Sequence, residues 1–497
     1  MSGTDRDPVG GADRDPVSGT GQHPVGGTGR HPACDTGRHP LGDTGQHPVR
    51  GAEQNGDVLD DYALVRVPEH ARCSWLSVAV QRFGQVSSFQ QFLVGAVLGF
   101  GMSFRDAVIA ITVGSVMLEV ITILLGIAGV REGVSVSVLA RWSGFGRKGS
   151  ALVGLLIALS LAGWFGVQNG VFARGMHDLA GGTPEWVWAL IGGAVITVIT
   201  VFGFTMMAWT AYLTVPSFLF LAGYSIIDTL AGHSLADLMA APPPGPAMSL
   251  AEGTTLVSGA FILGAIMTPD MTRFNRRPAD VVKQTLISVT LGEYLIGLTA
   301  VLLAQAAKSV DIVGIITSSS GLLGTLVLAT AILKINDWNL YSSSLGLVNS
   351  VDVLIGRRVG RRAVTWVIGA AGTALSAIGI VDNFTDFLET IGVLAPPVAG
   401  IIIAEYYVVR QFRPELDRAR ADNTMPAQTA DWMPLSLVCW AFGSAVGKYL
   451  DAGIPAINSV LAALLLYIAA GKALMARRAS SVDVVPLAET DLTKSGG

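Results

Sequence analysis

Long apolar runs, separated by short polar and charged stretches, fill the chain from about residue 75 almost to its end. Most of these runs reach the ~20 residues that an α-helix needs to cross a bilayer. The pattern predicts an all-α polytopic membrane protein with about twelve transmembrane helices. We expect these helices at 76–101, 104–129, 149–175, 185–206, 208–231, 250–268, 281–306, 319–347, 363–380, 385–409, 432–449 and 455–475.

Charge is scarce and unevenly placed. Of the 497 residues only 14% are Asp, Glu, Lys or Arg, whereas a soluble domain carries about a quarter. No basic patch with interleaved aromatic residues is present, so nucleic acid is not an expected partner; the expected surroundings are a lipid bilayer. No cofactor or metal motif stands out either, because Cys34, Cys73 and Cys439 lack the spacing of metal ligands.

Positive residues gather in the even-numbered loops between the predicted helices. The positive-inside rule then places both termini in the cytoplasm and the chain in the cell membrane as a multi-pass protein. The clusters are Arg131, Arg141, Arg147 and Lys148; Arg273, Arg276, Arg277 and Lys283; Arg357, Arg358, Arg361 and Arg362; Arg410, Arg413, Arg418 and Arg420; and Lys472, Arg477 and Arg478.

The first seventy residues are of low complexity. An eight-residue unit recurs in them, as in TGQHPVGG and TGRHPLGD. Gly, Pro and charge without apolar periodicity cannot offset the entropy of ordering, so residues 1–70 are expected to be a disordered cytoplasmic tail. The repeated histidines could bind a metal, but spaced histidines without ordered Cys or carboxylate residues are a weak metal signal. We therefore favour spacer sequence. The membrane domain is expected at 71–478, followed by a cytoplasmic C-terminal tail at 479–497.

The first predicted helix is unusually polar. A polar segment at membrane depth is plausible where it lines a cavity or is locally unwound. The alternative, a helix that starts near Phe92, leaves too few residues before Ser103. We therefore favour a cavity-lining segment. Its interrupting residues are Arg82, Gln85, Ser87, Ser88, Gln90 and Gln91.

The third and sixth helices place aromatic residues among glycines. Trp164 and Gln168 are four residues apart and share one helix face. A flat aromatic ring beside an amide suits a planar heterocycle that forms hydrogen bonds, but packing and interhelical hydrogen bonding explain the pair equally well. In the sixth helix Phe261 lies between Gly259 and Gly264. Small residues around it suggest a break or a close crossing, and ordinary small-residue packing is the simpler explanation.

The eighth helix carries charge within its apolar run. Lys334 and Asp337 are three residues apart, close enough to pair on one face, and Asn336 lies beside them. Charged residues at membrane depth are expensive and usually functional. The alternative is a helix that ends near Lys334, but the run from Leu322 to Leu333 is too short to span. Glu119 and Glu293 are further embedded carboxylates that would also suit Lys334 as partners.

Four motifs in order resemble the nucleobase:cation symport-1 family, most closely its cytosine permease branch. They are GWFGVQ at 163–168, TPDMTRF at 268–274, NDWNLYSSSLGL at 336–347 and DNFTDFLETIGVLAPPVAGIIIAEYY at 382–407. The resemblance implies a LeuT-type fold, in which two inverted repeats of five helices are followed by two more helices. It also implies a secondary active transporter, not an enzyme, that imports a nucleobase or related heterocycle by alternating access.

The resemblance assigns roles to single positions. Trp164 matches the family's stacking aromatic, Phe261 matches an aromatic of the sixth helix, and Gln168 matches an amide that some members use. Asn336 and Asp337 match the polar pair of the eighth helix. Ser88 is a further pocket position, where cytosine permeases have Phe; Leu161 stands in place of a Gln and Ala260 in place of a Ser. These departures weaken the case for cytosine itself and leave a purine, allantoin, hydantoin or a vitamin precursor as alternatives. A membrane sensor that binds without transporting is the alternative from another class.

The coupling ion shows the sharpest departure. Sodium-coupled members have two hydroxyl residues just before the helix-eight Asn, where this chain has Lys334 and Ile335. Isoleucine offers sodium no ligand, and an ammonium group would take the cation's place. The sequence therefore leads to the hypothesis that Lys334 replaces sodium and that its cycle of protonation couples transport to protons or permits uniport, because burial readily lowers the pKa of a lysine toward neutrality.

Overall fold

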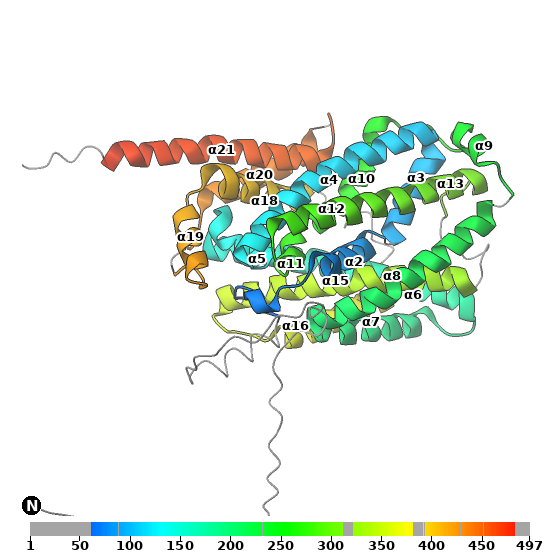
Figure 1. Cartoon of the computed structure of the whole chain (residues 1–497), viewed down its shortest axis with the longest axis horizontal. Coiled ribbons are helices and arrows are strands. Elements are labelled where there is room, and N and C mark those ends of the chain that lie inside the picture. The colour runs from blue at the N-terminus through cyan, green and yellow to red at the C-terminus, as the bar shows by residue number, and fades with distance from the viewer. Residues whose placement is uncertain are drawn as a thin grey trace, which may run out of the picture.

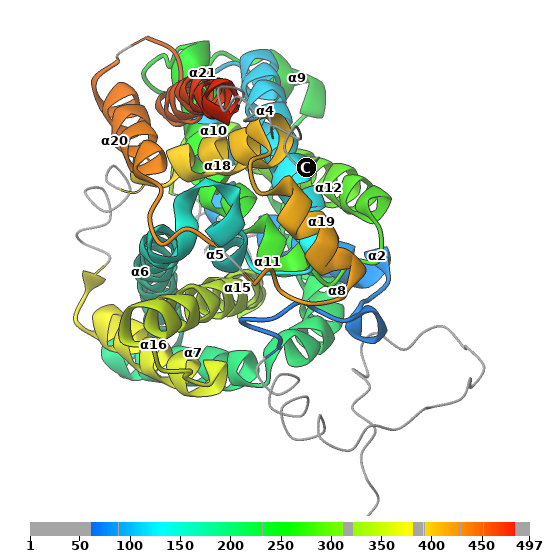
Figure 2. The same cartoon turned by 90° about the vertical axis from the view of Figure 1, so that its left-hand side faces the viewer.

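The computed structural model describes residues 61–482, apart from 88, 231, 312–321, 381–390, 392, 428 and 451. Within these residues every regular element is a helix, and the β-structure recorded is an isolated bridge between Cys73 and Asn275. The long helices run along one common direction (Figure 1) and pack around one another when they are viewed end on (Figure 2).

The helices follow the predicted apolar runs. Those of the first half are η2 (Glu69–Ala71), α2 (Trp75–Val86), α3 (Phe89–Gly101), α4 (Phe104–Glu132), α5 (Val136–Leu139), the π-helical η3 (Arg141–Phe145), α6 (Gly146–Ala180), α7 (Glu185–Val201), α8 (Gly203–Leu230) and α9 (Leu235–Ala240). Those of the second half are α10 (Leu250–Ile266), α11 (Thr268–Thr272), α12 (Pro278–Gly292), the π-helical η4 (Glu293–Gly297), α13 (Leu298–Ala307), α15 (Leu322–Ile355), α16 (Arg361–Ala377), α18 (Pro396–Ile403), the π-helical η6 (Ala404–Val409), α19 (Arg413–Ala421), α20 (Pro434–Tyr449) and α21 (Pro455–Val482).

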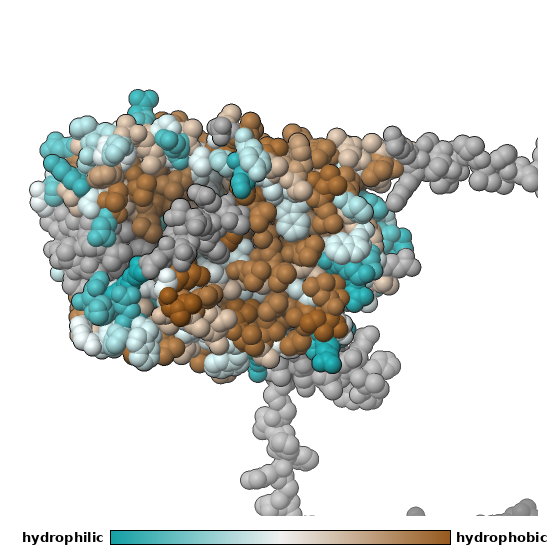
Figure 3. Space-filling view, turned by 180° about the vertical axis from the view of Figure 1, so that it is seen from behind, coloured by the Kyte–Doolittle hydropathy of each residue, from teal (hydrophilic) through white to brown (hydrophobic). Residues whose placement is uncertain are grey.

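The surface is that of a membrane protein. On the face shown in Figure 3, hydrophobic residues cover most of the middle, and hydrophilic residues gather toward the two ends. Among the described residues, four helical stretches are by length and composition long and apolar enough to cross a bilayer. Other helices, such as α7 and α10, have 17 residues, so the number of twelve spans stays a prediction. The four stretches are Phe104–Glu132, Arg141–Ala180, Pro278–Ala307 and Pro455–Ala476.

Two interruptions fall in the predicted helices that carry candidate site residues. The first helix is broken between Val86 and Phe89, within its polar stretch. The sixth is broken at Met267 and not at its glycines, because α10 runs without interruption through Gly259 and Gly264. Neither glycine serves a close crossing either, since a Cβ atom at Gly259 would meet nothing within 4 Å and one at Gly264 would make ordinary contacts.

α6 and α15 approach each other closely where they cross. A Cβ atom added to Gly154 would lie 2.5 Å from the carbonyl oxygen of Gly346, and one added to Gly346 would lie 2.5 Å from that of Gly154. Two facing glycines therefore let the two backbones touch, as in tightly packed membrane helices. Nearby, the Ser343 hydroxyl donates to the carbonyl of Ala158 at 2.8 Å. This contact holds the GWFGVQ segment of α6 and the NDWNLY segment of α15 in fixed register.

The positive loops meet at one end of the molecule, where residues 61–72 tie them together. Asp61 pairs with Arg361 at 3.4 Å and accepts from the Phe204 amide at 2.9 Å. The Arg273 guanidinium donates to the Tyr62 carbonyl at 2.9 Å. Residues 61–70 therefore pack onto the helical body, which corrects the expectation that the tail extends to residue 70. The repeats and their histidines lie outside the described residues.

A buried carboxylate, Glu132 at the end of α4, joins three of these segments. Its side chain is 1% exposed and accepts from the Tyr406 hydroxyl at 2.6 Å and from Arg420 at 2.8 Å. Arg66, itself buried, lies 3.4 Å away. Two cations and a phenol therefore satisfy one carboxylate, as a charge removed from water requires.

We expect Glu132→Ala to destabilise the protein by about 3 kcal/mol, because Arg66 loses its buried counter-charge. The measurement is thermal unfolding of the purified protein in detergent. Asp417→Asn is the matched control, since it removes an exposed partner of the same Arg420 and should change stability by less than about 1 kcal/mol. Equal unfolding temperatures for the two variants would contradict a structural role for the Glu132 cluster.

Candidate functional site

The two aromatic residues predicted for the site are buried in one apolar cluster. Trp164 on α6 is 7% exposed and Phe261 on α10 is 8% exposed. Both belong to the same core cluster as Ile335 of α15. This cluster extends through most of the helical body; within it α15 packs directly on α6, whereas α10 packs mainly on α4.

The polar pair of α15 lies directly against the Trp164 segment. Asn336 is fully buried, and its side-chain nitrogen donates to the Phe165 carbonyl at 3.3 Å. Its side-chain oxygen accepts from Asn339 at 3.0 Å. Asn336 therefore contacts the backbone of α6 one residue after Trp164. A ring that stacks on Trp164 would lie within its reach.

Asp337 and Lys334 form a buried ion pair. Lys334 Nζ lies 2.6 Å from Asp337 Oδ2, as the spacing of three residues predicts. It also donates to the Met207 carbonyl of α8 at 3.1 Å. The other oxygen of Asp337, Oδ1, has no hydrogen-bond partner in the described structure. The partner of Lys334 is thus Asp337 and not Glu119 or Glu293.

The Lys334 side chain lies between α15, α8 and the first helix. A Cβ atom at Gly84 would come within 2.8 Å of Lys334 Cγ, so the absence of a side chain at Gly84 gives the lysine its room. A void of about 10 Å³, roughly one water in size, adjoins Lys334. It is lined by Gly84, Ser87, Thr214, Val215, Phe218, Thr330, Ala331 and Lys334.

Two predicted residues stand apart from these contacts. Gln168, one turn along α6 from Trp164, is buried, and its Oε1 atom has no partner among the described residues. Ser88 lies outside the described residues, so its place in the site stays a prediction. The neighbour Asn169, which the sequence did not single out, donates to the Ala189 carbonyl at 2.8 Å and to the Ser376 hydroxyl at 3.1 Å.

Side chains of the interrupted first helix reach α10. Arg82 donates to the Gly264 carbonyl at 3.1 Å, and Gln90 donates to the carbonyl of Ala260, next to Phe261. Sequence alone flagged Arg82 and Gln90 as polar interruptions but gave no partner, because both acceptors are backbone carbonyls. These bonds fix both arms of the interrupted helix against the Phe261 segment.

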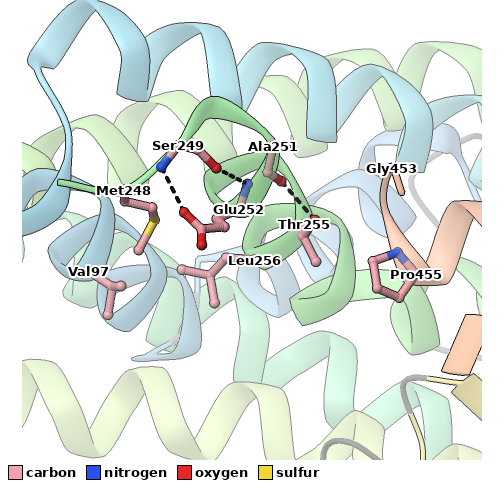
Figure 4. Close-up of a pocket in the computed structure, with 9 residues that line it drawn as sticks. All are labelled: Val97, Met248, Ser249, Ala251, Glu252, Thr255, Leu256, Gly453 and Pro455. Carbon is pink, nitrogen blue, oxygen red and sulfur yellow. Dashed lines mark hydrogen bonds between the residues drawn. The ribbon is translucent and has the colours of Figure 1, made fainter. Parts of the chain in front are cut away.

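A larger cavity, of about 550 Å³, lies elsewhere, at the start of α10 (Figure 4). Glu252 and Ser249 cap the helix there, with the Ser249 amide donating to Glu252 at 2.8 Å. Apolar side chains and the start of α21 complete the wall: Val97, Met248, Leu256, Gly453 and Pro455. None of the residues predicted for the site lines this cavity.

Comparisons with known proteins agree on one family. The model of the family described as "Permease for cytosine/purines, uracil, thiamine, allantoin" matches residues 66–469. The cytosine permease of Escherichia coli (strain K12) is 30% identical over 403 residues, covering 81% of this chain and 92% of that protein. The hydantoin permease of Microbacterium maritypicum is 24% identical over 424 residues, covering 80% and 84%.

A solved structure has the same fold. It is that of Mhp1, a nucleobase-cation-symport-1 family transporter, in a closed conformation with bromovinylhydantoin bound. Its TM-score to this chain is 0.71 at 21% identity, with 84% of this chain and 96% of that chain covered. The LeuT-type transporter fold expected from the motifs is thereby supported. The chain belongs to the family of permeases for cytosine/purines, uracil, thiamine and allantoin, and it is a multi-pass membrane transporter and not an enzyme.

Proposed function

We propose that the protein imports a nucleobase or a related planar heterocycle across the cell membrane as a secondary active transporter. The observation that carries the proposal is the buried contact of Asn336 on α15 with the Trp164 segment of α6, where Asn336 donates to the Phe165 carbonyl. The transporter domain extends from about residue 61, with both termini in the cytoplasm. Relatives that are named as cytosine and hydantoin permeases support this substrate class, since both ligands are flat rings with hydrogen-bonding edges.

The proposed binding mode follows from the side chains. The ring stacks on Trp164 with Phe261 nearby, because aromatic faces attract flat rings. Asn336 and the free Oδ1 of Asp337 bind its polar edge, together with the unpartnered Oε1 of Gln168. Movement of the helix bundle then exposes the site to one side of the membrane at a time.

We propose further that Lys334 takes the place of a coupling sodium ion and that transport is coupled to protons. The ammonium group lies between α15, α8 and the first helix, where it pairs with Asp337. The space beside the lysine side chain is a void of about one water in size. A positive charge tethered to the chain at this place would repel a sodium ion. A proton is then the remaining common ion that can drive accumulation.

Trp164→Ala is expected to weaken heterocycle binding by about 1–3 kcal/mol, since that is the value of one stacking contact. The measurement is ligand affinity of the purified protein across a panel of nucleobases and hydantoins. Trp186→Ala is the control, because Trp186 lies on α7 with half of its surface exposed. An unchanged affinity in Trp164→Ala for a ligand that the wild type binds would contradict the stacking assignment.

Uptake into proteoliposomes should not depend on sodium when pH and membrane potential are held constant. The double variant Lys334→Ser with Ile335→Thr should become sodium-dependent, because two hydroxyls are restored and Asp337 then needs a cation. Uptake with and without sodium is compared for both proteins. A steep dependence on sodium in the wild type would refute the assignment of Lys334.

The proposed orientation makes a prediction for labelling. In a variant without native cysteines, Ala247→Cys should react with a membrane-impermeant maleimide in intact cells, because its loop carries few positive charges and faces outward. Arg358→Cys, equally exposed but in a positive loop, should react only after the cells are opened. The reverse pattern would show that the termini lie outside.

A further inference from the structure

A second buried charged group lies away from Lys334, among the first, second and seventh predicted helices. Glu293, the first residue of η4, is 1% exposed, and Gln91 of α3 is equally buried. Gln91 Nε2 donates to Glu293 Oε2 at 2.6 Å. The other carboxyl oxygen, Oε1, has no hydrogen-bond partner in the described structure. Half of this carboxyl group is therefore free to carry a proton.

Glu293 has no counter-ion of its own. In the described part of the chain no Lys, Arg or His lies within ion-pair distance of it, unlike Asp337. The facing cation is Arg82 of α2, whose guanidinium is bonded to Gln85 at 2.9 Å and to the Gly264 carbonyl. The facing anion is Glu119 of α4, which accepts from Thr290, one turn before Glu293, at 2.8 Å.

The remaining elements packed against η4 add no charge nearby. Neither α3 nor α13 contains a titratable residue. On η4 itself Tyr294 is bonded to Thr112 of α4. A carboxylate without a paired cation is strongly disfavoured in such surroundings, whereas a neutral carboxyl is tolerated. These buried surroundings thus favour Glu293 with a proton bound.

The backbone connects Glu293 to the interruption of the first helix. η4 is a π-helical turn, a feature common at functional sites. A Cβ atom at Gly297 would lie 3.0 Å from Gln91 Nε2, and one at Gly292 would lie 2.7 Å from Val86. The seventh helix therefore packs against both arms of the interrupted helix. A movement of either arm changes the surroundings of the Glu293 carboxyl.

We propose that Glu293 is a proton-binding site of this transporter, which takes up a proton from one side of the membrane and releases it to the other in each transport cycle. This inference rests on the proposed transport function. The proton binds at Oε1 while the site is closed and dry. Movement of the first helix then admits water, which stabilises the charged carboxylate, and the proton leaves as a hydrated proton. One proton then crosses per turnover at Glu293.

The test uses the full chain in proteoliposomes that contain a pH-sensitive dye, with cytosine and a hydantoin as probes. Three readouts are taken: exchange of labelled probe at equal pH, accumulation of probe when the outside is one pH unit more acidic than the lumen, and acidification of the lumen. In the wild type a gradient of one pH unit supports up to about tenfold accumulation of the probe, if one proton moves with each neutral probe molecule. Entry of the probe should acidify the lumen.

Glu293→Gln should exchange probe at a rate close to that of the wild type but lose both the accumulation and the acidification, because an amide keeps the size and cannot release a proton. Glu293→Asp should keep the acidification. Glu119→Gln is the matched control, a carboxyl on the neighbouring α4 that is already bonded to Thr290, and should keep both. Accumulation or acidification that survives in Glu293→Gln overturns the inference, as does a wild type that transports without acidification. A wild type that neither exchanges nor accumulates any probe contradicts the proposed function itself.

Discussion

The ion pair between Lys334 and Asp337 is the contact on which the arrangement of the site depends. A single charge at membrane depth is costly, and removing one partner of a buried pair costs more than the pair contributes. The pair is short, at 2.6 Å, and the ammonium group also donates to the Met207 carbonyl of α8. α15 is therefore fixed against α8, and the glycine at Gly84 allows the first helix to close over the lysine. Asn336, on the same helix, donates to the Phe165 carbonyl of α6.

Close helix packing turns this local pair into a site. Gly154 and Gly346 let α6 and α15 touch backbone to backbone, which brings the Phe165 carbonyl within reach of Asn336. On the other side, Arg82 and Gln90 bind carbonyls of α10 and fix the Phe261 segment. Because dispersion and hydrogen bonds replace the hydrophobic effect between membrane helices, each of these short contacts matters for the register of the aromatic and polar groups. A second polar group, around Glu293, borders the same interrupted helix.

Patterns in the local sequence predict much of this structure, but they miss the features that depend on contacts between residues far apart in the sequence. The polar residues from Arg82 to Gln91 mark the interruption of the first helix, and the three-residue spacing gives the Lys334–Asp337 pair. The break at Met267 is not visible, because the glycines nearby are the stronger helix breakers on propensity and yet lie in continuous helix. Residues 61–70 look like tail by composition. Several of them are buried, and Asp61 and Arg66 pair with Arg361 and Glu132, which lie far away in the sequence. No local pattern encodes such partners, and none encodes the π-helical turn at Glu293.

A structure of the protein with a bound nucleobase or hydantoin would decide where the substrate binds. We expect a ring stacked on Trp164, its polar edge at Asn336 and Asp337, and the Lys334 ammonium group next to Asp337 with no sodium ion between α15 and the first helix. A ring seated instead in the cavity at the start of α10, against Met248 and Leu256, would contradict it, as would a sodium ion in the place given to Lys334.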